Sequence, residues 1–197
     1  MLGTDPEKHD HMPPRTSVPP QRGMTKEVFG CPWFRVHEEG WNDFSDLDRQ
    51  PFYRIESSDG VLVLAMTRNE EIILVRQFRQ ALRRNTIECP AGSIEDGESP
   101  EEAAARELYE ETRYRAGTLR LLGSGHIMMN RYNAKDFLFM AQDCEVLSQT
   151  PQVPDQNVLL VSPQEFKRLV TSGDFEHIPA LSLFSLVEWQ FGLRLVV

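Results

Sequence analysis

The chain has 197 residues, enough for one domain with a substantial core and hardly enough for two. Its 40% hydrophobic and 26% charged residues are ordinary for a soluble globular protein. The 30 acidic residues outnumber the 21 basic ones, giving a net charge of -9, and the sequence has no obvious basic stripe for a nucleic-acid backbone, so no nucleic-acid partner is expected.

Residues 1–24 are rich in proline and polar residues and lack the apolar core of a secretory signal, so we expect a flexible N-terminal tail there. Three cysteines, Cys31, Cys89 and Cys144, are an odd number without a metal-type spacing. They are expected to be reduced thiols, as in a cytoplasmic protein.

The pattern between residues 52 and 89 is typical of β-strands. "FYRIES" alternates, "VLVLAMT" and "IILVRQF" are β-rich runs joined by the turn "TRNEE", and a short strand "TIEC" ends at Pro90. We expect these strands to form a meander.

A helix is expected to begin at Ser99. Ser99 suits the N-cap, Pro100 the first helical position, and Glu102, three residues after the cap, completes a capping box. The following "EEAAARELYEET" has strong helix propensity. Leu108 and Ala104 are expected to face the core.

The second half of the chain mixes strands and helices irregularly. Strands "LRLLGSGHI" and "AKDFLFMAQ" flank the polar loop "MMNRYN", and "NVLLV" precedes two helices near 163–172 and 179–195. Glu188, Gln190 and Arg194 interrupt the apolar C-terminal run, which favours a buried core helix over a membrane span. The irregular alternation favours an α+β fold with a mixed sheet over a doubly wound fold.

The helix after Ser99 carries three carboxylates at helical spacing. Glu107, Glu110 and Glu111 share a face, where like charges cost about 0.2–0.5 kcal/mol per pair. One interpretation is a solvated helix face. The other is a site for a hard divalent cation such as Mg2+, which takes oxygen ligands and is commonly shared with substrate phosphates.

Residues 92–114, which we call the box, resemble a known pattern. Gly92, five residues, Glu98, seven residues, then "RELYEETRY" is similar to the Nudix box, G-x5-E-x7-R-E-U-x-E-E-x-G-U, where U is a bulky apolar residue. Seven of the nine specified positions match, and Tyr114 is acceptable as the last apolar residue. Arg113 stands where the pattern has glycine. A helix commonly ends with glycine because that residue adopts the left-handed conformation, so we expect a strained left-handed turn at Arg113.

The resemblance extends beyond the box. "VRQFRQ" and "IECPAG" look like the approach to the box in ADP-ribose and nucleotide-sugar pyrophosphatases of the Nudix superfamily. This resemblance implies a mixed-sheet α/β/α sandwich over residues 51–197, an N-terminal extension over 25–50 that contributes to a homodimer, and hydrolysis of a nucleoside diphosphate linked to a further group.

Carried over position by position, the resemblance implies roles for the box residues. Glu107, Glu110 and Glu111 would bind Mg2+, with Mn2+ as an alternative, and the Ala91 carbonyl would be an additional ligand. Arg106, counted with the three glutamates among the catalytic residues, would form an ion pair with Glu98 that braces the loop against the helix.

Substrate contacts are expected before the box. Arg76 and Arg79 are candidates for binding the diphosphate, because arginine binds phosphate bidentately, and the alternative for each is surface charge. Glu88 would contact ribose or adenine, or be structural. Trp33, Trp41 and Tyr53 would stack on a base, or lie in the core or at an interface.

The catalytic base is the weak point of the resemblance. Where ADP-ribose enzymes often have an acidic residue, this chain has Gln156 and Asn157, with Asp155 nearby. Two functions therefore stay open: a Mg2+-dependent pyrophosphohydrolase of ADP-ribose or a related nucleotide sugar, and a catalytically impaired binding module of the same fold that acts as a sensor or partner.

Overall fold

The computed structural model describes residues 22–41, 51–146 and 157–192. Most of the segment predicted as a tail lies outside these residues, and so do Asp155 and Gln156. The first strand begins at Arg22, inside the range 1–24 assigned to the tail.

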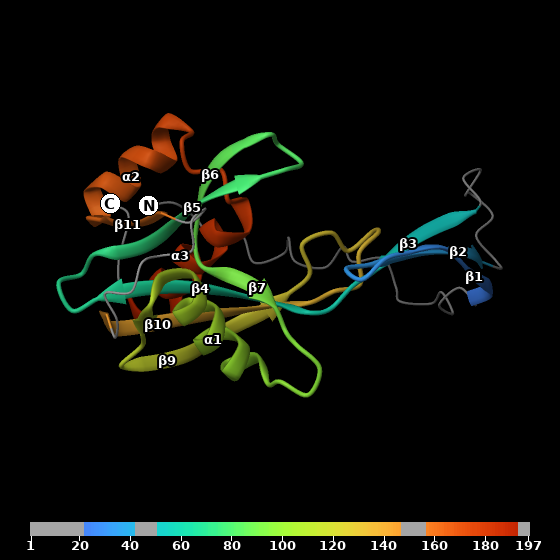
Figure 1. Ribbon diagram of the computed structural model, residues 1–197, viewed down its shortest axis with the longest axis horizontal. Helices are drawn as coiled ribbons and strands as arrows, with labels where there is room; N and C mark the ends of the chain where they lie inside the picture. Colours follow the sequence, from blue (N-terminus) through green and yellow to red (C-terminus); the bar gives the residue numbers. More distant parts are fainter. Residues whose placement is uncertain (1–21, 42–50, 147–156, 193–197) are drawn as a thin grey trace, which may run out of the picture.

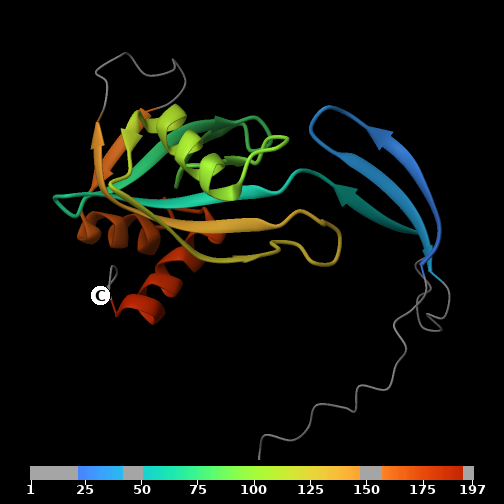
Figure 2. The same cartoon turned by 90° about the horizontal axis from the view of Figure 1, so that it is seen from below.

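The strands form two separate sheets (Figures 1 and 2). The small sheet is antiparallel and has the order β1-β2-β3, with bounds β1 (Arg22–Gly30), β2 (Arg35–Trp41) and β3 (Phe52–Glu56). The large sheet contains β4 (Gly60–Thr67), β5 (Ile72–Arg79), β6 (Arg84–Glu88), β7 (Ala91–Ser93), β8 (Tyr114–Arg115), β9 (Thr118–Gly125), β10 (Asp136–Val146) and β11 (Asn157–Val161). The small sheet projects away from the rest of the described chain (Figure 2).

The predicted meander is wrong at its first strand. β4, β5 and β6 pair antiparallel in sequence, as expected, but β3 pairs with β2 and not with β4. The side chains of β3 are at most half-buried, whereas six consecutive residues of β4 are buried. β3 therefore suits a thin outer sheet, and β4 a central strand covered on both faces.

The large sheet is mixed, as predicted from the sequence. β10 runs parallel to β4, and the other pairings are antiparallel. Alternate residues of β4 point to opposite faces, so Val61 and Val63 enter one core cluster and Leu62 and Leu64 another.

Helices cover both faces of this sheet. α1 (Pro100–Thr112) lies on one face, and α2 (Pro163–Ser172) and α3 (Ile178–Phe191) lie on the other (Figure 2). Phe166 of α2 stacks on Phe184 of α3 with ring centroids 4.2 Å apart. The α+β sandwich is thus confirmed. No helix in the described part of the chain is long and apolar enough to cross a membrane.

α1 begins as its sequence predicts. The Ser99 hydroxyl accepts a hydrogen bond from the Glu102 N–H at 3.3 Å, and the Glu102 carboxylate accepts one from the Ser99 N–H at 2.9 Å. Ala103, Ala104 and Leu108 are fully buried against the sheet. The small alanines let the helix approach the strands closely, which brings its carboxylates to β7.

α1 ends at a strained residue. Arg113 has φ 64° and ψ 13°, in the left-handed region, and its N–H donates to the Tyr109 carbonyl at 2.8 Å. A side chain in this conformation costs about 1–2 kcal/mol. The Arg113 guanidinium lies over the Tyr109 ring, 5.3 Å from its centroid, and offsets part of that cost. The left-handed turn expected at the glycine position of the pattern is therefore present, with arginine in place of glycine.

We expect Arg113→Gly to raise the free energy of unfolding by about 0.5–1 kcal/mol in urea denaturation. Glycine removes the left-handed strain, and the lost cation–π contact and the greater entropy of unfolded glycine cancel part of the gain. The control is Arg113→Ala, which removes the guanidinium and keeps the strain, and should be less stable than the wild type. A glycine variant no more stable than the alanine variant would contradict the prediction.

Candidate active site

The Glu107 carboxylate lies directly against the backbone of β7. A methyl group built on Gly92 would overlap the Glu107 carboxyl group, so no larger residue fits at this position without moving that side chain. Glycine is needed here for close approach rather than for an unusual backbone conformation. This contact explains why the box begins with glycine.

The Glu111 carboxylate is held one helical turn further along α1. Its oxygens accept hydrogen bonds from the side-chain amide of Gln77 on β5 and, at 3.1 Å, from the Ala91 N–H on β7. Burial raises the pKa of Glu111 to about 7, although both hydrogen bonds act in the opposite direction. Burial also raises the pKa of Glu107. Two carboxylates thus occupy a site that disfavours their charge.

Arg106 ties the box together. Its guanidinium donates to Glu98 at 2.8 and 2.9 Å and to the Ser93 carbonyl at 2.9 Å, so the ion pair expected from the sequence is present. The same guanidinium contacts Glu107 at 2.8 Å and Glu110 at 3.3 Å. The Glu98 hydrogen bonds are the main reason why the pKa of Arg106 is raised.

The three glutamates predicted as metal ligands share one helix but make separate contacts. Glu107 and Glu110 face Arg106, Glu111 faces Gln77, and the Glu110 side chain is more than half exposed. Among the described residues, no three His, Cys, Asp or Glu side chains are gathered so that they could hold a metal ion. The donor chemistry nevertheless fits a hard divalent cation, because these are oxygen ligands and two of them, Glu107 and Glu111, are partly buried with raised pKa values. The ligand assignment stays a prediction, and so does the role of the Ala91 carbonyl.

Arg79 and Glu88 form a second polar group on the same face as Glu111. Arg79 Nε donates to Glu88 at 2.7 Å, and Thr86 also donates to Glu88. Burial alone would raise the pKa of Glu88, but the Arg79 and Thr86 hydrogen bonds outweigh it and lower that pKa. Glu88 therefore holds a charge beside the site and orients Arg79.

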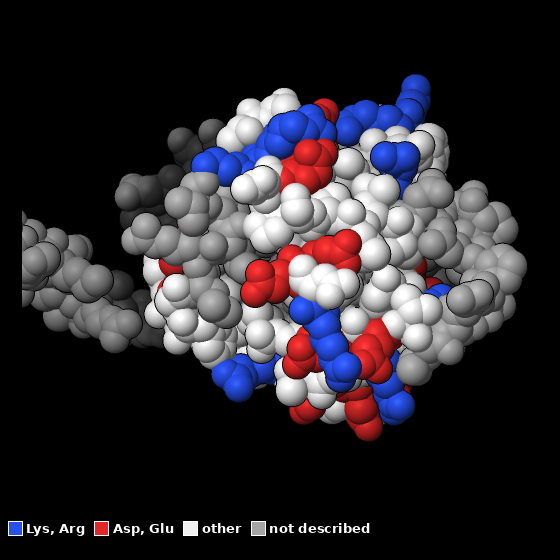
Figure 3. Space-filling model, turned by 90° about the vertical axis from the view of Figure 1, so that its left-hand side faces the viewer, with Lys and Arg blue, Asp and Glu red and all other residues white. Residues whose placement is uncertain are grey.

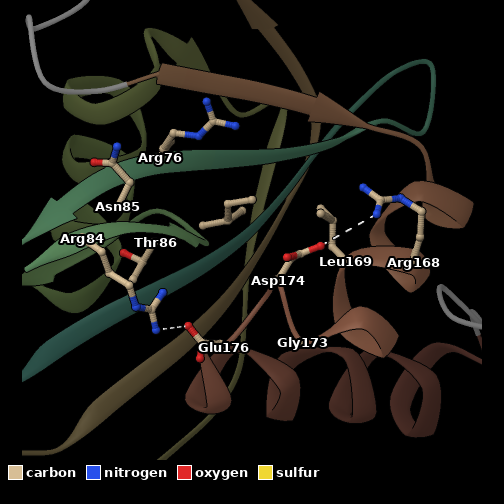
Figure 4. Close-up of a pocket in the computed structure, with 10 residues that line it drawn as sticks. Arg76, Arg84, Asn85, Thr86, Arg168, Leu169, Gly173, Asp174 and Glu176 are labelled. Atoms are coloured by element: carbon tan, nitrogen blue, oxygen red, sulfur yellow. Dashed lines mark hydrogen bonds and ion pairs between the residues drawn. The ribbon is translucent and has the colours of Figure 1, made fainter. Parts of the chain in front are cut away.

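Arg76 lies on the opposite face of β5. Residues 76 and 79 are an odd number apart on one strand, so they point to different faces. Arg76 lines a cavity of about 560 Å3 between β5, β6 and the segment that follows α2, and it makes no ion pair with the residues drawn in Figure 4. In this cavity Arg84 pairs with Glu176, and Arg168 pairs with Asp174. The structure therefore does not bring the two predicted phosphate ligands together.

Charges on the face of the molecule shown in Figure 3 are unevenly distributed. Lys and Arg side chains gather along its upper edge, and acidic and basic side chains lie side by side in its lower part.

Aromatic side chains line a cleft beside the box loop. The cleft has a volume of about 760 Å3 and is lined by Trp33 and Phe34 of the turn between β1 and β2, by Tyr132, and by Glu95 and Asp96 of the box. Trp33 is 78% exposed, which excludes the core; base stacking and an interface stay open as interpretations of its sequence position. Tyr53 instead donates to Glu38 at 3.1 Å, away from the cleft lining.

Sequence analysis missed Gln77, which holds Glu111. The signal was present, since Gln77 and Arg79 are two residues apart and must share a face. Phe34 and Tyr132 were also missed, because nothing local in the sequence predicts that the small sheet lies beside the box loop. Asn157, at the expected place of the catalytic base, starts β11 and pairs in register with Arg76.

Comparisons with known proteins match this chain to one family. A family model of the NUDIX domain matches residues 57–182. An ADP-ribose pyrophosphatase of Bacillus subtilis (strain 168) is 34% identical over 123 residues, which cover 61% of this chain and 66% of that protein. An ADP-sugar pyrophosphatase of Mus musculus is 50% identical over 64 residues, 30% of this chain and 29% of that protein. The matches thus span just under two thirds of the first relative and under a third of the second.

A solved structure of similar fold is described as "Crystal structure of ADP compounds hydrolase". It superimposes with a TM-score of 0.74 at 24% identity, covering 88% of this chain and 95% of that one. At this identity the match supports the fold.

We expect Gly92→Ala to lower the free energy of unfolding by about 1–3 kcal/mol, the usual cost of overpacking, because its methyl group collides with Glu107. Gly125→Ala is the matched control, since a methyl group there meets nothing within 4 Å. Adding Glu107→Ala to the Gly92→Ala variant should recover part of the loss in a double-mutant cycle, measured by urea denaturation. Strict additivity of the two changes would contradict the proposed contact.

Proposed function

This chain belongs to the NUDIX domain family, and we propose that it is a Mg2+-dependent pyrophosphohydrolase that cleaves the diphosphate of ADP-ribose or a related nucleotide sugar by water attack on phosphorus. The observation that carries the proposal is the seating of Glu107 and Glu111 against β7, where burial raises both pKa values and a cation would restore their charge. The relatives described as ADP-ribose and ADP-sugar pyrophosphatases support this substrate class.

In this proposal Glu107, Glu110 and Glu111 hold the divalent metal, with the Ala91 carbonyl as an additional ligand. When bound, the metal neutralises charge that develops on the diphosphate oxygens and lowers the pKa of a bound water. Mn2+ is the alternative metal, because it accepts the same oxygen donors.

The remaining residues position these ligands and bind the substrate. Gln77 and the Ala91 N–H fix Glu111, and Gly92 leaves room for Glu107. Arg106, held by Glu98 and Ser93, keeps the box loop against α1 and balances two of the glutamates. Its role is therefore to position the catalytic residues.

Arg79 is the residue best placed to bind the diphosphate. It lies on the same face as Glu111. The Glu88 carboxylate accepts hydrogen bonds from two of its guanidinium nitrogens, Nε and Nη2, and so fixes the orientation of the guanidinium. The 43% exposed side chain of Arg79 can still reach a ligand from solvent. Because the Glu88 carboxylate is paired with Arg79, it would contact the ribose or adenine only by giving up hydrogen bonds to Arg79.

The aromatic cleft is proposed to take the nucleobase, with Trp33 stacking on it, because every base presents a π-face to an aromatic ring. The small sheet is proposed to join a second copy of the chain in a homodimer. Its exposed Val28 and Phe29 are part of the apolar surface that such an interface would bury. A cytoplasmic location is proposed from the free thiols of Cys89 and Cys144.

The experiment that tests the proposal is a product assay with ADP-ribose, NADH, GDP-mannose, UDP-glucose and diadenosine polyphosphates, each with Mg2+ and with Mn2+. The expected result is conversion of ADP-ribose to AMP and ribose 5-phosphate, abolished by a chelator. Tight binding of ADP-ribose without turnover would instead favour the catalytically impaired module, for which Asn157 at the expected place of the base is the supporting observation.

We expect Glu107→Gln, Glu110→Gln and Glu111→Gln each to lower the turnover of ADP-ribose by about a hundredfold or more, because each removes a ligand charge while keeping the side chain nearly isosteric. Glu101→Gln, in the exposed first turn of α1, is the matched control and should leave turnover unchanged. Turnover like that of the wild type in all three variants would exclude the metal assignment.

We expect Arg79→Ala to weaken binding of a non-hydrolysable ADP-ribose analogue by about 1.5–3 kcal/mol, the scale of a hydrogen bond to a charged group. Arg76→Ala tests the other predicted phosphate ligand, and the strand geometry makes a smaller effect the expected result. Calorimetric titration of both variants measures the difference. Equal losses of affinity would mean that the substrate contacts both faces of β5. Unchanged affinity in both variants would mean that neither arginine binds the diphosphate and that both are ordinary surface charges.

A further inference from the structure

A second cavity lies on the α3 face of the large sheet, away from the box. Its volume is about 520 Å3, and it is formed by the ends of β9 and β10 and the first turns of α3. Leu138, Leu186 and Pro179 give it largely apolar walls, and the exposed side chains of Ile127 and Ile178 border it. α1 covers the opposite face of the same sheet (Figure 2), so the sheet separates this cavity from the glutamates of the box.

One acidic side chain interrupts the apolar lining. Asp136 begins β10, and its Oδ2 atom is inaccessible to water and has no hydrogen-bond partner among the described residues. Most buried polar atoms in proteins have a partner, and leaving one without costs about 1–3 kcal/mol. Asp136 therefore has an unused hydrogen-bond acceptor beside the cavity.

The backbone makes room for this carboxylate. Gly60 of β4 lies opposite Asp136 in the parallel pair, and a methyl group at Gly60 would come 2.6 Å from Asp136 Oδ1. The absence of a side chain at Gly60 thus lets the Asp136 carboxylate lie against the sheet.

The surroundings of Asp136 favour a positive partner. Burial and then the neighbouring carboxylate of Asp59 raise the pKa of Asp136, and they outweigh the opposite effect of His126; a cation in the cavity would add to the effect of His126. No Lys or Arg is among the residues described as lining the cavity. The adjacent Lys135 instead lies over the Phe137 ring, 5.1 Å from its centroid. His126 lines the cavity, with its Nδ1 3.0 Å from the Ala134 carbonyl oxygen.

We propose that this cavity is a ligand site for a small, largely apolar amine. The Asp136 carboxylate turns toward the cavity so that its Oδ2 atom accepts a hydrogen bond from the ammonium group, while the hydrocarbon part of the amine packs between β10 and α3. The site does not depend on the proposed hydrolase function. The cavity is large enough for a ring-sized ligand, and a few polar groups in an apolar pocket are the usual composition of a small-molecule site.

The test uses the full chain and three probes of equal ring size: benzylamine, benzyl alcohol and benzoate. Binding is followed by shifts of the backbone amide resonances in a two-dimensional NMR titration. The expected order of affinity is benzylamine, benzyl alcohol, benzoate, with shifts in residues 123–127 and 178–186. Shifts confined to the box helix would mean that the amine binds the acidic face of α1, and would overturn the proposal.

Asp136→Asn should weaken benzylamine binding about tenfold or more, the factor that corresponds to losing a charged hydrogen bond. Asp143→Asn, at an exposed position of the same strand, is the matched control and should leave the affinity unchanged. Glu111→Gln should also leave it unchanged, which separates this site from the box. Unaltered binding in Asp136→Asn would overturn the proposal.

A second variant distinguishes loss of the ligand site from a folding defect, which could also explain weaker binding in Asp136→Asn. Ser182 is exposed on the first turns of α3 and lines the cavity, so Ser182→Phe should fill the cavity without disturbing the core. Its amide spectrum should keep the dispersion of the wild type, and benzylamine should no longer shift the resonances of residues 123–127. Retained benzylamine binding in this variant would contradict the assigned cavity.

Discussion

The candidate active site depends on how closely α1 approaches the backbone of β7. Two carboxylates, Glu107 and Glu111, reach that backbone because Gly92 has no side chain and because Ala103 and Ala104 allow the helix to lie flat on the sheet. A larger residue at any of these three positions would separate the helix from the strand. The spacing of the box is therefore a packing constraint as well as a chemical one, since the same residues that admit the helix also determine where its acids lie.

This close approach has an energetic cost that the surrounding residues offset only in part. Burial disfavours the charged forms of Glu107 and Glu111, as their raised pKa values show. Arg106 compensates Glu107 directly, but for Glu111 the largest compensation comes from the neutral donors Gln77 and the Ala91 N–H, and Arg79 adds a smaller effect without a direct contact. A neutral donor stabilises a carboxylate less than a cation does. The deficit is thus greatest at Glu111, and a bound cation would benefit this side chain most. Strain at Arg113 ends the same helix without displacing it, because the N–H of that residue still bonds to Tyr109.

Sequence analysis predicted the parts of the molecule that local rules determine. The capping box at Ser99, the buried faces of Leu108 and Ala104, the left-handed turn at Arg113 and the Arg106–Glu98 pair follow from spacings of a few residues, or from a pattern long enough to be recognised. The rest depends on pairings distant in the sequence. β3 alternates like any half-buried strand, and its sequence does not say whether β2 or β4 is its partner. Gln77 and Tyr132 acquire their roles only when β5 meets α1 and the small sheet lies beside the box loop. Nothing local in the sequence indicates that Asp136, at the start of β10, buries its Oδ2 atom.

The parity of residues along the central strands explains how one sheet can carry two different sites. On β5, Gln77 and Arg79 face α1 together with Glu111, whereas Arg76 faces the side of α2. On β4, Val61 and Val63 pack under α1, and Leu62 and Leu64 pack under the other two helices. A change of one residue in register would exchange these faces, placing Arg79 in the apolar layer and leucine beside the glutamates. The buried apolar residues of β4 oppose such a shift. Both faces of this strand are covered by helices, so a shift in either direction would disrupt the packing of both core clusters. The hydrophobic pattern of the central strands thus fixes the positions of the charged residues of β5.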